Sequence, residues 1–285
     1  MMKKIVMMLA AVMVLAACES EETTTPATEV TGTGTTTTCS INFSPYEQEE
    51  MTRGAVSIAT VVTQLDVWIS DGTNVIEAHQ TSTDAGFGSL SVTLDKTKTY
   101  EVIAVGHKAA GAATLTDGVI AFPDDKVTHA MVYHGTLTPA TTTTLNAEMQ
   151  RIVGQFKLDL TDQVPAEVVT MQFDLGSQPN RWDVENGQGV NPQQRTTSFS
   201  NFSRRTDGTA AFTLYAISTN DAATNINITV KALDNNGGTV QQRIFANVPI
   251  RNGYRTTYRG NFFIDTEATS NFLVGDWQDY DAVNF

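Results

Sequence analysis

Apolar side chains recur at every second residue over much of this 285-residue chain. The segments 65–69 and 90–94 show this repeat most clearly, and the first is followed by the turn Asp71-Gly72. A repeat of two places successive side chains on opposite faces of a β-strand, whereas a helix needs a repeat of about 3.6 residues. Frequent threonine adds to the preference for strands. We therefore expect an all-β protein that buries alternate side chains between paired sheets.

The expected strands fall into two series that divide near Met149. The first comprises 65–69, 90–94, 100–104, 118–122, 130–138 and 141–149, and the second comprises 153–160, 168–175, 210–217, 226–233, 243–248 and 254–264. Regularly spaced short strands are typical of β-sandwiches. Asp234–Gly238 predicts a hairpin, because its residues accept positive φ.

Two segments depart from the strand pattern. Residues 55–62 predict one or two helical turns, since apolar residues there have helical spacing. The long polar stretch 176–205 is expected to form a large surface loop or an excursion from the sheet.

The beginning of the chain has the pattern of a bacterial lipoprotein signal. Two lysines precede the apolar run 5–17, which is too short to cross a bilayer core of about 30 Å. Leu15-Ala16-Ala17-Cys18 resembles the box at which residues 1–17 are removed and Cys18 is lipidated. Acyl chains such as palmitate would then hold the protein on the bacterial outer membrane. The alternative is an ordinary signal with an incidental cysteine.

After the signal we expect a linker and two domains. Residues 18–38 are rich in Thr, Glu and Gly and predict a disordered linker. Its acidic start, 18–22, resembles the surface-export signal of Bacteroidota lipoproteins, although a solvated tether explains it equally well. The remaining length predicts an N-terminal β-sandwich over 39–149 and a C-terminal one over 150–285.

The second cysteine, Cys39, has no partner inside the chain if Cys18 is lipidated. We expect an inert thiol in or near a strand, and an intermolecular bridge is the alternative.

Charge and motifs exclude several classes of function. The net charge of −13, with 18 Lys and Arg against 31 Asp and Glu, argues against a nucleic-acid partner. No nucleophile elbow, P-loop or dinucleotide fingerprint occurs, so we expect no catalytic residues, no cofactor and no enzyme activity. We expect no metal site either: the acidic pairs lack the spacing of a calcium loop, and the histidines are expected at the surface. Those histidines are His79, His107, His129 and His134.

Two tryptophans offer a different kind of site. Trp68 is expected to point outward from its strand, and Trp182 lies in the long polar stretch. Exposed tryptophans can stack on sugar rings, so a glycan-binding surface lipoprotein is the alternative function. Packing of both rings beneath a loop is the competing explanation.

Several short segments together resemble the fimbrillin family of Bacteroidota, the subunits of type V pili with their anchor and accessory members. The segments are 51–55 (Met-Thr-Arg-Gly-Ala), 65–69, 100–107 and 125–128 in the first half, and 151–156 and 259–263 in the second. The resemblance implies two tandem transthyretin-like β-sandwich domains and a fimbrium used in cell adhesion. The implied partners are other fimbrial subunits, with host proteins or glycans as further ones.

The resemblance also implies a mechanism of assembly. Arg53 matches the position at which a protease cuts shaft subunits, so that Gly54 becomes the new N-terminus. Loss of the strand-like segment 40–44 would open a groove that a neighbour's strand fills by β-strand addition. The donor in the family is the C-terminal segment, here 272–285. The donor residues there are Phe272 and Val274, which lie on one face, with Trp277 and Tyr280 spread among acids, so the tail shows the alternation of a donor strand only in part. An anchor or accessory role, in which Arg53 stays uncut, is the alternative.

Overall fold

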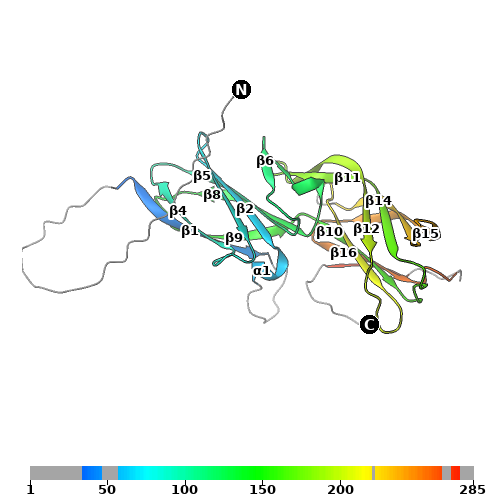
Figure 1. Cartoon of the computed structure of the whole chain (residues 1–285). Helices are drawn as coiled ribbons and strands as arrows, with labels where there is room; N and C mark the ends of the chain where they lie inside the picture. Colours follow the sequence, from blue (N-terminus) through cyan, green and yellow to red (C-terminus); the bar gives the residue numbers. More distant parts are fainter. Residues whose placement is uncertain (1–33, 47–56, 220–221, 265–270, 277–285) are drawn as a thin grey trace, which may run out of the picture. The chain divides into compact units, whose positions relative to one another are not determined.

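Strands dominate the computed structural model, which describes residues 34–46, 57–219, 222–264 and 271–276 (Figure 1). The all-β fold expected from the repeat of two is confirmed. All described strands belong to one unit, Thr35–Phe285.

The strands, in chain order, are β1 (Thr36–Pro45), β2 (Gln64–Ser70), β3 (Val75–Thr81), β4 (Ser89–Asp95), β5 (Tyr100–His107), β6 (Thr114–Thr116), β7 (Val119–Ala121), β8 (Ala130–Leu137), β9 (Thr144–Arg151), β10 (Gly154–Leu160), β11 (Thr170–Asp183), β12 (Gln188–Ser200), β13 (Ala211–Ala216), β14 (Thr224–Leu233), β15 (Thr239–Ile250), β16 (Tyr254–Gly260) and β17 (Asn271–Asp276). The described helices are α1 (Ile58–Val61), within the predicted helical segment, and the 3₁₀ turn η1 (Pro123–Asp125).

The N-terminal strands form a seven-stranded sheet in the order β3-β2-β5-β8-β9-β1-β4. Alternate residues of its strands point into one hydrophobic cluster, which includes Ile41, Leu65, Val102 and Leu137. The helix α1 closes this cluster with Ile58 and Val61, and Ser57 caps it by accepting a hydrogen bond from the Ala59 amide at 3.3 Å.

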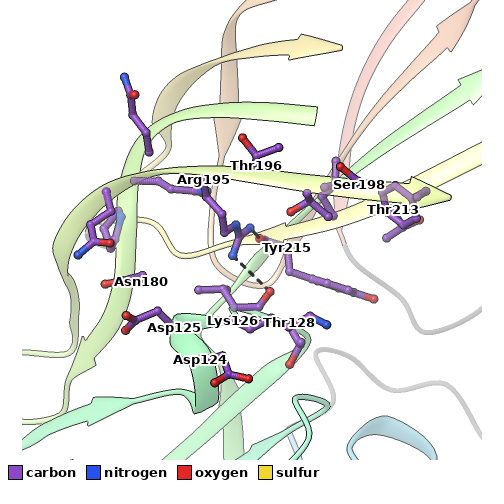
Figure 2. A pocket seen from close by; sticks show the side chains of 18 residues that line it. Asp124, Asp125, Lys126, Thr128, Asn180, Arg195, Thr196, Ser198, Thr213 and Tyr215 are labelled. Carbon is purple, nitrogen blue, oxygen red and sulfur yellow. Dashed lines mark hydrogen bonds between the residues drawn. The ribbon is translucent and has the colours of Figure 1, made fainter. Parts of the chain in front are cut away.

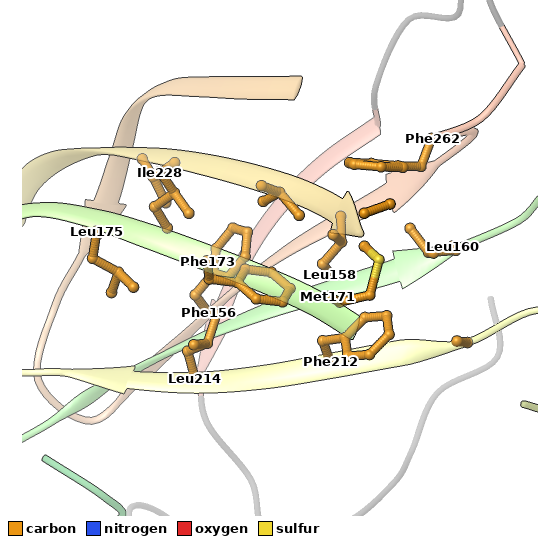
Figure 3. Packing of buried hydrophobic residues seen from close by; sticks show 14 of the residues in the cluster. Phe156, Leu158, Leu160, Met171, Phe173, Leu175, Phe212, Leu214, Ile228 and Phe262 are labelled. Carbon is orange, nitrogen blue, oxygen red and sulfur yellow. The ribbon is translucent and has the colours of Figure 1, made fainter. Parts of the chain in front are cut away.

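Two further sheets enclose a second core. One has the order β13-β10-β16-β17, and the other has the order β15-β14-β11-β7-β6 with β12 paired to β11. Phe156 and Phe212 from the first sheet pack against Phe173 and Ile228 from the second (Figure 3). The two sheets therefore form a sandwich around an aromatic interior.

The same strand pairing occurs twice in the chain. The strand β1 runs parallel to β9 and antiparallel to β4, and β10 runs parallel to β16 and antiparallel to β13. No sequence repeat accompanies this structural repeat. The hairpin β6-β7 breaks the symmetry, because it comes from the first strand series but pairs with β11 of the second.

Two sequence expectations are wrong in this region. The stretch 176–205 is not a surface loop, because most of it lies in the long antiparallel hairpin β11-β12. The end of the predicted linker, 36–38, is also structured, since β1 begins at Thr36.

Candidate functional site

The strand β1 occupies an unusual place for the first strand of a chain. It lies inside the sheet, paired on one side with β4 from Thr36 to Asn42 and on the other side with β9 from Ser40 to Pro45. Both neighbours come later in the sequence, and among the described strands β4 pairs with β1 alone, so β1 connects β4 to the rest of the sheet. Its removal would leave β4 and β9 without a partner on the sides that face each other.

Alternate residues of β1 enter the core. Cys39 and Ile41 are fully buried and Phe43 is 5% exposed, whereas Ser40 and Asn42 between them face outward. Burial of an Ile or Phe side chain stabilises a fold by about 1.5–3 kcal/mol. Ile41 and Phe43 therefore contribute roughly 3–6 kcal/mol together, and a strand that replaced β1 would have to supply side chains of similar size.

Backbone hydrogen bonds fix the register of β1 at three points. The amides of Ser40, Phe43 and Tyr46 donate to the carbonyls of Thr143, Gly88 and Met149, each at 2.8 Å. Gly88, just before β4, permits the close approach of Ile58 in α1, because its φ is +88° and a Cβ there would lie 2.5 Å from Ile58 Cγ2. The predicted strand over 40–44 is confirmed, and it lies one strand in from the β4 edge of the sheet.

Cys39 lies in β1, as expected for a thiol in or near a strand. The thiol is free and buried, and desolvation raises its pKa. A raised pKa keeps the thiol protonated and unreactive while β1 is in place.

The C-terminal strand β17 lies at the edge of its sheet. It pairs antiparallel with β16, with Phe272 opposite Tyr258 and Val274 opposite Thr256, and among the described strands it has no other neighbour. Release of β17 would therefore break one ladder of backbone hydrogen bonds.

The other residues predicted to act in lipidation, processing and donation lie outside the described residues. They are Cys18, Arg53, Gly54, Trp277 and Tyr280.

Two histidines expected at the surface are buried. His107 is fully buried, and its Nε2 lies 3.0 Å from a carboxylate oxygen of Asp66, whose other oxygen lies 2.6 Å from Nδ1 of His79. His129 is 2% exposed, and burial beside Arg151 lowers its pKa to about 3. The surface expectation is therefore wrong for these two: inside the fold, His107 Nε2 pairs with Asp66 and His129 Nδ1 pairs with the carbonyl of Val61. His134 does lie at the surface, in contact with Glu101.

The expectation that Trp68 and Trp182 are exposed and could stack on sugar rings is wrong as well. Trp68 and Trp182 are each 6% exposed and belong to one hydrophobic cluster with Ile120 and Ile152. Trp68 is buried because β2 is covered on both faces, so its alternation does not separate an inner from an outer face.

The structure does contain a hollow beside the polar hairpin that holds Trp182. The cavity has a volume of about 560 Å³, and its walls come from the turn 124–128, the hairpin β11-β12 and the edge strand β13 (Figure 2). More than half of the lining residues carry hydroxyl or carboxamide groups. Arg195 crosses from β12 and donates to the carbonyls of Val127 and Tyr215, which holds the walls together.

The sequence analysis missed the side chain that most distinguishes this cavity, Gln178. It is 2% exposed, and neither its Nε2 nor its Oε1 has a hydrogen-bond partner. A β-bulge between Leu175 and Gln178 shifts the register of β11 against β12 just before it. Gly176 inside a strand is the one sequence signal that could have indicated the bulge.

Within the described ranges, no three His, Cys, Asp or Glu side chains are grouped as metal ligands. None of the helices in this part of the chain is long and apolar enough to cross a membrane.

Comparison with known families supplies an assignment for the chain. A family model described as a family of unknown function, DUF6562, matches residues 124–279, which is more than half of the chain. The chain belongs to the DUF6562 family. Comparison with the curated proteins found no match for this DUF6562 member.

Solved structures share the fold at low sequence identity. A candidate cell adhesion protein from Bacteroides ovatus matches with a TM-score of 0.50 and 14% identity, over 86% of this DUF6562 chain and 98% of its own. Candidate polysaccharide binding proteins from Bacteroides thetaiotaomicron match with a TM-score of 0.50 and 10% identity, over 85% and 98%. A fimbrial assembly protein from Parabacteroides distasonis has a TM-score of 0.43 and 11% identity, over 85% and 96%. The first two comparisons show that the fold of this DUF6562 member also occurs in solved structures of proteins from Bacteroides.

Proposed function

We propose that the chain is a non-enzymatic structural subunit of a surface fimbrium, and that subunits join by β-strand addition. The observation that carries this proposal is the place of β1, which precedes Arg53 in the sequence and yet lies between β4 and β9. Here a cut between Arg53 and Gly54 leaves β1 held only by non-covalent contacts.

Departure of the cut β1 creates the acceptor groove. The groove offers the free edges of β4 and β9 and the emptied core positions of Cys39, Ile41 and Phe43. A donor strand would run parallel to β9 and antiparallel to β4, as β1 does. Backbone pairing would give affinity, and the alternate apolar positions would give specificity.

The C-terminal segment is the donor in this proposal. Phe272 and Val274 are two residues apart, like Ile41 and Phe43, so both could enter neighbouring core positions of a second copy. The edge position of β17 supports the assignment, because only its pairing with β16 must be exchanged. Trp277 and Tyr280 would continue the same strand.

The rest of the proposal concerns location. Lipidation of Cys18 would hold the subunit on the outer membrane, and the linker would carry the sandwiches over 39–149 and 150–285 away from it. A cut at Arg53 then distinguishes a shaft subunit from an anchor or accessory subunit, which keeps its lipid. Proteins of like fold that are described as candidates for cell adhesion support a surface role.

The proposal can be tested with the purified chain and an arginine-specific protease. N-terminal sequencing should find Gly54, and the cut protein should form filaments visible by negative-stain electron microscopy. A synthetic peptide of residues 36–45 in excess should stop growth, because it refills the groove. The variant Arg53→Ala should stay monomeric under the same treatment.

A donor variant provides the matched control. Phe272→Asp in the cut protein should abolish filament growth, since it would place a charge in the core position. Asn271 directly precedes Phe272, and neighbouring residues of a strand alternate between its two faces. Asn271→Asp should therefore leave growth unchanged. Cut protein that stays monomeric without the blocking peptide would refute strand addition.

A further inference from the structure

The carboxamide of Gln178 is the least explained polar group in the described part of the chain. Gln178 is 2% exposed and lines the 560 Å³ cavity, and both its nitrogen and its oxygen lack a partner. A buried amide without hydrogen bonds destabilises a folded protein, because it gives up its bonds to water and gains none in return. An uncompensated cost of this kind in a cavity wall points to a ligand that completes the hydrogen bonds.

The β-bulge shows that the fold turns Gln178 toward this wall. Between Leu175 and Gln178 the strand β11 has one residue more than β12, and such an insertion redirects the following side chains. Without the extra residue, the alternation of β11 would place the Gln178 side chain on the other face of the hairpin.

The second unpartnered group in the same cavity belongs to Arg195. Its two terminal nitrogens donate to the carbonyls of Val127 and Tyr215, but its buried Nε has no partner. The cavity therefore offers two kinds of free donor, the Gln178 amide and the Arg195 Nε, and one free acceptor, the Gln178 carbonyl.

The charges around the cavity balance. Asp124, Asp125 and Lys126 line the cavity from the turn 124–128, and Arg195 lines it from β12 (Figure 2). The two negative and two positive side chains leave the lining with no net charge. A hydroxyl group both donates and accepts, so several adjacent hydroxyls can satisfy Gln178 and Arg195 without bringing in charge. Ser198 and Thr213 line the same space and can continue the network, whereas the Thr196 hydroxyl donates to Asp174 at 2.8 Å.

We propose that this cavity binds a neutral glycan, with Gln178 as its central hydrogen-bonding residue. The volume lies within the range of about 300–1,000 Å³ that is usual for small-molecule sites. A peptide strand fits less well, because strand addition needs alternating apolar pockets, and more than half of this lining carries hydroxyl or carboxamide groups. The site is separate from β1 and β17, so it does not depend on the proposed assembly.

The test uses the full chain on a printed array of neutral glucan, galactan, mannan and N-acetylglucosamine oligosaccharides, with sialylated and uronic-acid oligosaccharides on the same slide. Calorimetric titration with the neutral glycan that gives the strongest signal then compares three proteins. We expect Gln178→Leu to weaken binding at least tenfold and Gln188→Leu, at the other end of the same hairpin, to change it less than twofold. The melting temperature of Gln178→Leu should not fall, because the substitution removes an unpaired buried amide.

Thr213→Val, a near-isosteric change on the opposite wall, provides a second variant that does not alter Gln178. We expect it to weaken binding at least threefold. Three results would overturn the proposal: no neutral glycan bound, equal binding by the wild type and Gln178→Leu, or preference for acidic glycans or for a peptide of residues 36–45. None of these three binding results bears on filament growth of the cut protein, so the glycan proposal and the assembly proposal can fail independently.

Discussion

At the scale of single residues, His129 shows how the fold fixes a protonation state. Its Nδ1 lies 2.9 Å from the carbonyl oxygen of Val61 and therefore carries the proton that it donates. Its Nε2 lies 3.4 Å from Nε of Arg151, a group that can only donate, so Nε2 is unprotonated. Hydrogen bonding and burial agree that the ring is neutral, which is consistent with a pKa lowered to about 3.

This lowered pKa predicts a loss of stability in mild acid. An unfolded histidine titrates near pH 6.5, so between pH 6.5 and pH 3 the unfolded state binds more protons than the native state. The free energy of unfolding must then fall as the pH decreases, by about 2 kcal/mol from His129 alone between pH 7.5 and pH 5. Urea unfolding at both pH values should show that His129→Gln loses about 2 kcal/mol less than the wild type.

The exposed His134 supplies the comparison for this prediction. His134→Gln keeps His129 in place, so it should still show the loss of about 2 kcal/mol that His129 contributes over the same pH range. Equal losses in all three proteins would mean that His129 is protonated in the native state.

At the scale of elements, a strand is predictable from sequence where one of its faces is exposed to solvent. Which of its residues are buried is harder to predict. The alternation in 90–94 and 130–138 located β4 and β8 because core and solvent faces differ in polarity. In β2 the central five residues are all buried. The alternation therefore located the strand but wrongly predicted that Trp68 is exposed to solvent. The hairpin β11-β12 was mistaken for a loop, because its second strand is polar and largely exposed.

Of the candidate site, the sequence predicts the strand itself but not the partners of that strand or the cavity residue Gln178. Apolar alternation in 40–44 was enough to predict a strand, but its two neighbours depend on contacts across about 50 and 100 residues of sequence, which a local pattern does not contain. Gln178 was not predictable, because a β-bulge and a lack of partners are properties of the folded backbone.

The contact between β1, β4 and α1 leads to a prediction at Gly88. Its φ of +88° disfavours any side chain, and a Cβ would also lie 2.5 Å from Ile58 Cγ2. We expect Gly88→Ala to lower the free energy of unfolding by about 3 kcal/mol or more. Gly86 has a similar φ of +81° with nothing within 4 Å, so Gly86→Ala should cost only about 1–2 kcal/mol. Equal losses in urea unfolding would show that β1 and α1 do not restrict Gly88.

At the scale of the whole molecule, a third hydrophobic cluster connects the two strand series. It contains Trp68 from β2 and Ile120 from β7 together with Trp182 from β11 and Ile217. The pairing of β7 with β11 adds backbone hydrogen bonds to this connection. Side chains buried in a common cluster lose their contacts together, so the two proposed sandwiches should not unfold independently.

Calorimetry of the full chain can measure this coupling. We expect one unfolding peak with equal calorimetric and van't Hoff enthalpies. Ile120 is fully buried, so Ile120→Ala should cost about 2–5 kcal/mol and move the entire peak down by roughly 5–15 °C. Ile76 on β3 is 39% exposed, and Ile76→Ala should move it much less. Two peaks, of which Ile120→Ala shifted only one, would mean that the cluster does not join the sandwiches and that each carries its stability alone.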